Sequence, residues 1–122
     1  ASNPQEIFAT GASGGIWTVV LATFFLAVLT PLGEEFLFRG VVTNALLRYG
    51  PVVGVVGGAL VFALFHGINP VFPAAVVCGL AAGELFRRSA SIWPAVMVHA
   101  VFNLPTIPLL VLAQAAQSTP AP

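Results

Sequence analysis

Three charged side chains interrupt a long apolar stretch of this sequence: Glu34, Glu35 and Arg39. On a helix, Glu35 and Arg39 are four residues apart with the acid first, which is the favourable order for an ion pair. Neighbouring residues project about 100° apart on a helix, so Glu34 points elsewhere. We therefore predict a structural ion pair between Glu35 and Arg39, with Glu34 left as a free acid for proton transfer. The alternative is that both glutamates only form the solvated start of a helix.

Two histidines and an asparagine are the other polar side chains expected at this level. Counted at ~1.5 Å per residue from the arginine-bearing end of each expected helix, Glu34 and His66 lie roughly 21 and 22 Å up, and His99 roughly 16 Å up. Asn103 follows His99 by four residues and shares its face, where its amide can donate to a developing oxyanion or hold the imidazole. Helix packing is the alternative for Asn103, and a buried core position is the alternative for each histidine. The counts predict that the three titratable groups lie at one depth.

One glutamate and two histidines are also a ligand set that catalytic zinc uses. The sequence lacks the His-Glu-x-x-His spacing of a helical zinc site, so a metal would have to be held by residues from three separate helices. We favour a site without a metal or other cofactor. Zinc bound by Glu34, His66 and His99 is the alternative.

The composition places these residues in a membrane protein. The chain has 122 residues, of which 58% are hydrophobic and 7% are charged, whereas an ordinary soluble domain carries roughly 25% charged residues. An ionisable group inside a membrane segment is costly and normally faces a protein interior or a water-filled cavity. The net charge is zero and all four basic residues are arginines, which argues against nucleic acid as a partner. Cys78, the only cysteine, is expected to be a small buried residue.

The elements that must position the site are helices. Proline, glycine and charge signals divide the apolar sequence into expected helices over residues 16–32, 31–48, 52–66, 70–86 and 91–105. Thr30 and Pro31 resemble an N-cap followed by proline at the first helical position, although a kinked continuation of the first helix is the alternative. We predict an all-α fold, a polytopic transmembrane helix bundle of about four to five helices that forms the core of a larger protein. Its domains are a flexible lead-in (1–15), the core (16–113) and a polar tail (114–122).

The arginines predict how the bundle is oriented. From Arg48, one helix leads away and the next returns the chain to Arg87 and Arg88, so all three arginines lie on one face. Basic residues near membrane segments favour the cytoplasmic side. We expect this face to be cytoplasmic in an integral protein of a bacterial cell membrane.

The same residues resemble the motifs of a known family. The patterns are Glu34-Glu35-x-x-x-Arg39 followed by Gly40, then Phe62-x-x-x-His66, then His99-x-x-x-Asn103, in this order and within hydrophobic helices. They resemble the three motifs of the CPBP family, also called Abi intramembrane proteases, which comprises CAAX prenyl endopeptidases and bacteriocin-processing enzymes. The resemblance covers residues 31–103.

The resemblance implies hydrolysis of a peptide bond within the membrane. Glu34 would be the general base on a water molecule, His66 would help to position that water, and His99 with Asn103 would stabilise the tetrahedral oxyanion. The implied partners are a hydrophobic or prenylated, CAAX-type peptide and the membrane lipid. Two other functions stay open: a non-catalytic membrane partner such as a bacteriocin self-immunity protein, and a proton or cation path. The sequence does not indicate an oligomeric state.

Overall fold

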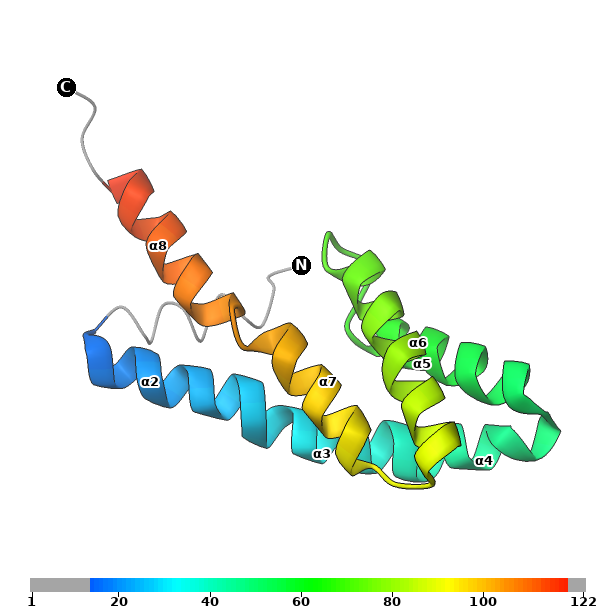
Figure 1. Cartoon of the computed structure of the whole chain (residues 1–122). Helices are drawn as coiled ribbons and strands as arrows, with labels where there is room; N and C mark the ends of the chain where they lie inside the picture. Colours follow the sequence, from blue (N-terminus) through cyan, green and yellow to red (C-terminus); the bar gives the residue numbers. More distant parts are fainter. Residues whose placement is uncertain (1–13, 119–122) are drawn as a thin grey trace.

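The computed structural model describes residues 14–118, and within this range it is helical and contains no strand. The expected all-α fold is therefore confirmed. The elements join into four continuous helices with short connections (Figure 1). In chain order they are α2 (Ile16–Phe24), the π-helical η1 (Phe25–Leu29), α3 (Thr30–Leu37), the π-helical η2 (Phe38–Thr43), α4 (Asn44–Leu46), the 3₁₀ turn η3 (Leu47–Tyr49), the π-helical η4 (Val53–Gly57), α5 (Gly58–Phe65), α6 (Phe72–Ser89), α7 (Trp93–Asn103) and α8 (Thr106–Ser118).

The first helix does not break at Thr30 and Pro31, so the predicted N-cap there is wrong. Helix continues from Ile16 to Tyr49, and the Thr30 side chain caps nothing. The π-helical segment η1 explains why the helix continues through Pro31. A proline ring normally clashes with the carbonyl group four residues earlier, which here belongs to Ala27. Ala27 lies in the middle of η1, where the wider helix accommodates the ring. The 34-residue helix would be about 51 Å long at ~1.5 Å per residue, so it must tilt or extend beyond a ~30 Å hydrocarbon core.

The other boundaries lie close to the predicted ones. The long helix ends at Tyr49, where Gly50 has a φ of 112°, and the chain turns back into the next helix. α7 begins at Trp93 with Pro94 in its first turn and ends at Asn103. After a short turn, α8 continues as far as Ser118, so the described part of the expected polar tail is helical. Of the expected lead-in, residues 1–13 lie outside the described part of the chain.

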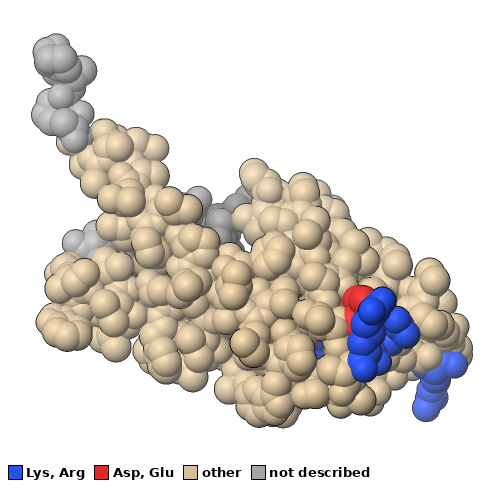
Figure 2. Space-filling model, in the orientation of Figure 1, with Lys and Arg blue, Asp and Glu red and all other residues tan. Residues whose placement is uncertain are grey.

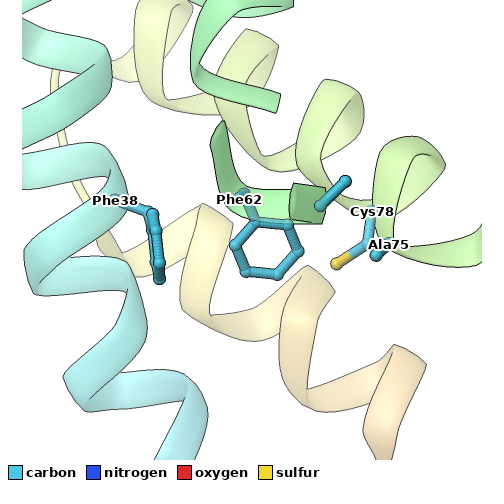
Figure 3. Packing of buried hydrophobic residues seen from close by; sticks show 5 residues of the cluster. Phe38, Phe62, Ala75 and Cys78 are labelled. Carbon is cyan, nitrogen blue, oxygen red and sulfur yellow. The ribbon is translucent and has the colours of Figure 1, made fainter. Parts of the chain in front are cut away.

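The core lies where η2, α5 and α6 meet. Its buried side chains are those of Phe38, Phe62, Ala63, Ala75 and Cys78, and Figure 3 shows Phe62 between Phe38 on one side and the α6 residues on the other. Cys78 is buried, as the sequence predicted. Close approach of α5 and α6 depends on Gly79, because a Cβ atom there would lie 2.9 Å from the Cα of Ala59.

The outer surface is mostly apolar. Large hydrophobic side chains are exposed along the outer faces of the helices, and examples are Trp17 (76% exposed), Val41 (60%) and Met97 (70%). Two helices, Ile16–Tyr49 and Trp93–Ser118, are long and apolar enough to cross a membrane. On the face drawn in Figure 2, the charged side chains gather toward one end and most of the remaining surface is uncharged. These features agree with the predicted membrane bundle.

Candidate active site

Glu34, His66 and His99 converge from three helices. Glu34 lies in α3, His66 directly follows α5, and His99 lies in α7. The Oε2 atom of Glu34 is 3.3 Å from Nε2 of His99 and 3.5 Å from Nε2 of His66. The structure thus brings together the three groups that the depth count placed at one level. Their side chains differ in exposure: His99 is 3% exposed, and Glu34 and His66 are 22% and 27% exposed.

His66 is oriented by the end of its own helix. Its Nδ1 atom lies 2.7 Å from the backbone carbonyl oxygen of Phe62, which also accepts the backbone N–H of His66 at 3.3 Å. A carbonyl can only accept a hydrogen bond, so the proton between the two atoms belongs to the imidazole. His66 therefore carries a proton on Nδ1 and turns Nε2 toward Glu34.

Glu35 and Arg39 form the ion pair that the sequence predicted. Arg39 Nη1 donates to Glu35 Oε1 at 3.1 Å, and both side chains are 0% exposed. Arg39 Nη2 also donates to the carbonyl oxygen of Gly79 in α6, at 2.9 Å. The pair accordingly joins the long helix to α6. Glu35 has a further contact that the sequence did not indicate, because its Oε1 atom lies 2.8 Å from Nδ1 of His99.

Phe62 packs against the charged and imidazole groups of the site. Its ring centroid is 4.4 Å from that of His66 and 5.2 Å from that of His99, which it meets edge-on at 86°. The guanidinium carbon of Arg39 lies 4.6 Å from the same ring centroid. Sequence reasoning included Phe62 in a motif but gave it no role. The sequence could have indicated the contact between Phe62 and His66, because the two residues are four positions apart and share one helix face.

Asn103 binds the backbone of the long helix. In η1 the N–H of Thr30 donates to the carbonyl of Phe25, five residues earlier. In the same pattern the carbonyl of Leu26 would accept from the N–H of residue 31, but that residue is a proline and has no N–H. Asn103 Nδ2 donates to this Leu26 oxygen at 3.1 Å. The observed contact of Asn103 is thus the packing between helices that the sequence left as an alternative. The His99 imidazole is held instead by Glu35.

A cavity of about 490 Å³ opens beside these residues. Glu34, His66, His99 and Asn103 all contribute to its wall. The Oε2 atom of Glu34 is buried and accepts no hydrogen bond from any described residue. The remaining wall is mainly apolar with a few polar groups that sequence reasoning missed; it consists of Leu26, Thr30, Phe62, Phe65, Asn69, Pro70, Val71, Ala74, Ala75, Cys78, Phe102 and Thr106.

The arrangement suits proton transfer to or from a small molecule next to Glu34. A carboxylate oxygen without a hydrogen-bond donor, at 3.3 and 3.5 Å from two imidazole nitrogens, can accept a proton from a water molecule placed beside it. Within residues 14–118, no group of three or more His, Cys, Asp or Glu side chains is arranged to hold a metal ion.

Comparison with known proteins identifies the family. Residues 15–105 match the family model described as type II CAAX prenyl endopeptidase Rce1-like. A search of curated proteins and a search of solved structures each found no match. The family match confirms the resemblance to CPBP proteases and includes every residue of the three motifs. The chain therefore belongs to the type II CAAX prenyl endopeptidase Rce1-like family.

Proposed function

We propose that this membrane protein is an endopeptidase that hydrolyses a peptide bond of a hydrophobic or prenylated, CAAX-type substrate within the membrane. One observation carries the proposal: Glu34 lines the cavity, and its buried Oε2 atom accepts no hydrogen bond from a described residue and lies 3.5 and 3.3 Å from the Nε2 atoms of His66 and His99. A carboxylate so placed can activate water, and the family to which the chain belongs is one of proteases.

In the proposed reaction, Glu34 is the general base. It removes a proton from a water molecule that His66 helps to position, and the water oxygen adds to the carbonyl carbon of the scissile bond. His99, when it carries a proton on Nε2 as well as on Nδ1, donates a hydrogen bond to the negatively charged carbonyl oxygen, and the other N–H of the Asn103 amide donates to it as well. The proton held by Glu34 then passes to the leaving nitrogen as the C–N bond breaks, which yields a carboxylic acid and an amine.

The lining of the cavity supports an apolar substrate. Its wall combines the polar side chains of Glu34 and the histidines with aromatic and aliphatic side chains such as those of Phe65, Val71 and Phe102. Such a surface can bury an isoprenoid or a hydrophobic side chain while the peptide bond faces the carboxylate. Lipid around the apolar outer surface would deliver a substrate anchored in the same membrane.

We propose a mechanism without a metal or other cofactor. The described residues do not form a three-ligand group, and every step above uses only the chain's own side chains and water. We also place Arg48, Arg87 and Arg88 on the cytoplasmic face of a bacterial cell membrane, because arginines near membrane segments favour that side.

The test is cleavage by purified protein in liposomes. A prenylated peptide ending in a CAAX sequence is incubated with the wild type, with Glu34→Gln and with Glu84→Gln, and the products are measured by mass spectrometry. Loss of the general base should reduce kcat by about 10²–10⁴-fold. Glu84 is a suitable control because it pairs with Arg87 and Arg88 near the end of α6 and does not line the cavity.

Two results would contradict the proposal. Full turnover by Glu34→Gln would exclude Glu34 as the base. If the wild type binds the peptide but releases no product, and Glu34→Gln binds it equally well, the chain is a non-catalytic membrane partner. Comparison of peptide ends in membranes from wild-type and Glu34→Gln cells would identify natural substrates.

A further inference from the structure

We propose that Glu35 is a positioning residue: its carboxylate fixes the tautomer and the orientation of the His99 imidazole, so that Nε2 faces Glu34 and the cavity. The inference rests on the proposed function, because it assigns Glu35 a part in the same reaction. It extends the prediction from the sequence, which limited Glu35 to an ion pair with Arg39.

The contact that carries this inference joins two helices. Glu35 Oε1 lies 2.8 Å from Nδ1 of His99, a residue 64 positions later in the chain. Glu35 is 0% exposed and His99 is 3% exposed, so water does not compete for either atom. A buried hydrogen bond with a charged partner is stronger than a neutral one, and it holds the ring at a fixed angle.

The position of the proton follows from Arg39. The same Oε1 atom accepts from Arg39 Nη1 at 3.1 Å, and a guanidinium is always protonated and can only donate. An oxygen that already accepts from this cation is the ionised oxygen of a carboxylate. The hydrogen between Oε1 and Nδ1 therefore belongs to His99. Nε2 is then the nitrogen that faces the cavity, where it can take up a second proton and donate a hydrogen bond to a negatively charged oxygen, while the Glu35 carboxylate stabilises the imidazolium.

Within residues 14–118, no hydrogen bond other than the one to Glu35 holds this orientation, and Glu34 Oε2 lies 3.3 Å from Nε2 on the other side of the ring. Phe62 meets the ring edge-on and restricts its tilt, but an apolar edge does not distinguish the two nitrogens. Asn103, the other polar residue on the same helix face, donates to Leu26 instead. Glu35 is the described hydrogen-bond partner of His99 that can determine which nitrogen carries the proton.

A spectroscopic experiment tests the tautomer without any substrate. The protein is labelled with ¹⁵N-histidine, placed in lipid nanodiscs and studied by NMR; its two histidines are distinguished with a His66→Gln variant. We expect a protonated Nδ1 on His99 in the wild type. A wild-type His99 with an unprotonated Nδ1 would overturn the proposal. Since no cleavage is involved, this result stands or fails independently of the proposed protease activity.

A pair of variants separates positioning from stabilisation. Replacing a buried ion pair by apolar residues of similar volume is often tolerated, so Glu35→Met with Arg39→Met should fold but leave Nδ1 of His99 without its acceptor. Glu35→Gln is the matched control: because the Arg39 guanidinium can only donate, the amide oxygen should keep facing Arg39 Nη1 and should still accept from His99 Nδ1. Unfolding temperatures of both variants show how much each change affects stability.

For the double variant we expect a mixture of His99 tautomers and a loss of about 10–100-fold in kcat, with KM within about twofold of the wild type. Glu35→Gln should retain the wild-type tautomer and most of the turnover of the wild type. A folded double variant with wild-type kcat and tautomer would show that Glu35 only stabilises the fold, and would overturn the inference while leaving the role of Glu34 intact.

Discussion

At the scale of single residues, Glu34 and Glu35 are neighbours with different surroundings. The division between them was predictable, because spacing alone pairs Glu35 with Arg39 and directs Glu34 elsewhere. The meeting of Glu34 with both histidines was also predictable from depth along the helices. The contact between Glu35 and His99 was not, because it depends on how α7 is rotated about its own axis relative to α3, and one sequence does not fix that rotation.

The same three side chains give a prediction about zinc. Because the described residues form no three-ligand group, we expect purified protein to hold far less than one zinc ion per chain and to keep its activity after treatment with a chelator. Mass spectrometry with an inductively coupled plasma source measures the metal. Stoichiometric zinc that is lost in His66→Ala would instead favour the metal-dependent alternative, with Glu34, His66 and His99 as ligands.

At the scale of helices, small residues determine how closely the elements approach. The helices predicted over residues 52–66 and 70–86 lie close to the observed ones, and their glycines indicate close packing. The pairing of α5 with α6 could therefore be predicted from the sequence. The continuous first helix was only the alternative to a break at Thr30 and Pro31, because no characteristic composition marks the π-helical segment that accommodates Pro31. A proline after a threonine is typical of a helix start, and here packing prevailed over that local signal.

Gly79 provides the test at this scale. A Cβ atom in Gly79→Ala would lie 2.9 Å from a backbone atom of Ala59, which has little freedom to move, and the shift would also strain the bond from Arg39 to the Gly79 carbonyl. We expect the free energy of unfolding to fall by about 1–3 kcal/mol, together with lower cleavage activity. Thermal unfolding in detergent measures the loss.

The matched control is Gly33→Ala in α3. No atom lies within 4 Å of the Cβ position at Gly33, so alanine should leave stability unchanged or raise it by up to about 1 kcal/mol through its higher helix propensity. Equal destabilisation by the two changes would contradict a specific role for the α5–α6 contact.

At the scale of the whole molecule, the described chain is a small bundle with apolar outer faces and charge gathered toward one end (Figure 2). The composition alone was enough to predict a membrane protein, because 7% of the residues are charged, whereas an ordinary soluble domain has roughly 25%. The size and lining of the cavity were beyond sequence reasoning, since they depend on side chains from every helix that surrounds Glu34.

Orientation in the membrane can be tested with introduced cysteines. Ile68 and Ser89 lie near opposite ends of α6 and are exposed, and the single native cysteine is removed as Cys78→Ala. If the arginine-rich face is cytoplasmic, a membrane-impermeant maleimide should label Ser89→Cys only in inside-out vesicles and Ile68→Cys only in vesicles of the opposite orientation. The reverse pattern would place Arg87 and Arg88 outside the cell.

The hydrogen bond between Asn103 and Leu26 has a consequence for how this chain can change during evolution. Asn103 supplies a donor to a carbonyl that lacks one because residue 31 is a proline. A substitution that restored an N–H at position 31 would therefore alter what position 103 must provide. Two sites 72 positions apart in the chain are in this way constrained together, and the proline three residues before the first motif influences which residues are acceptable at the end of the third.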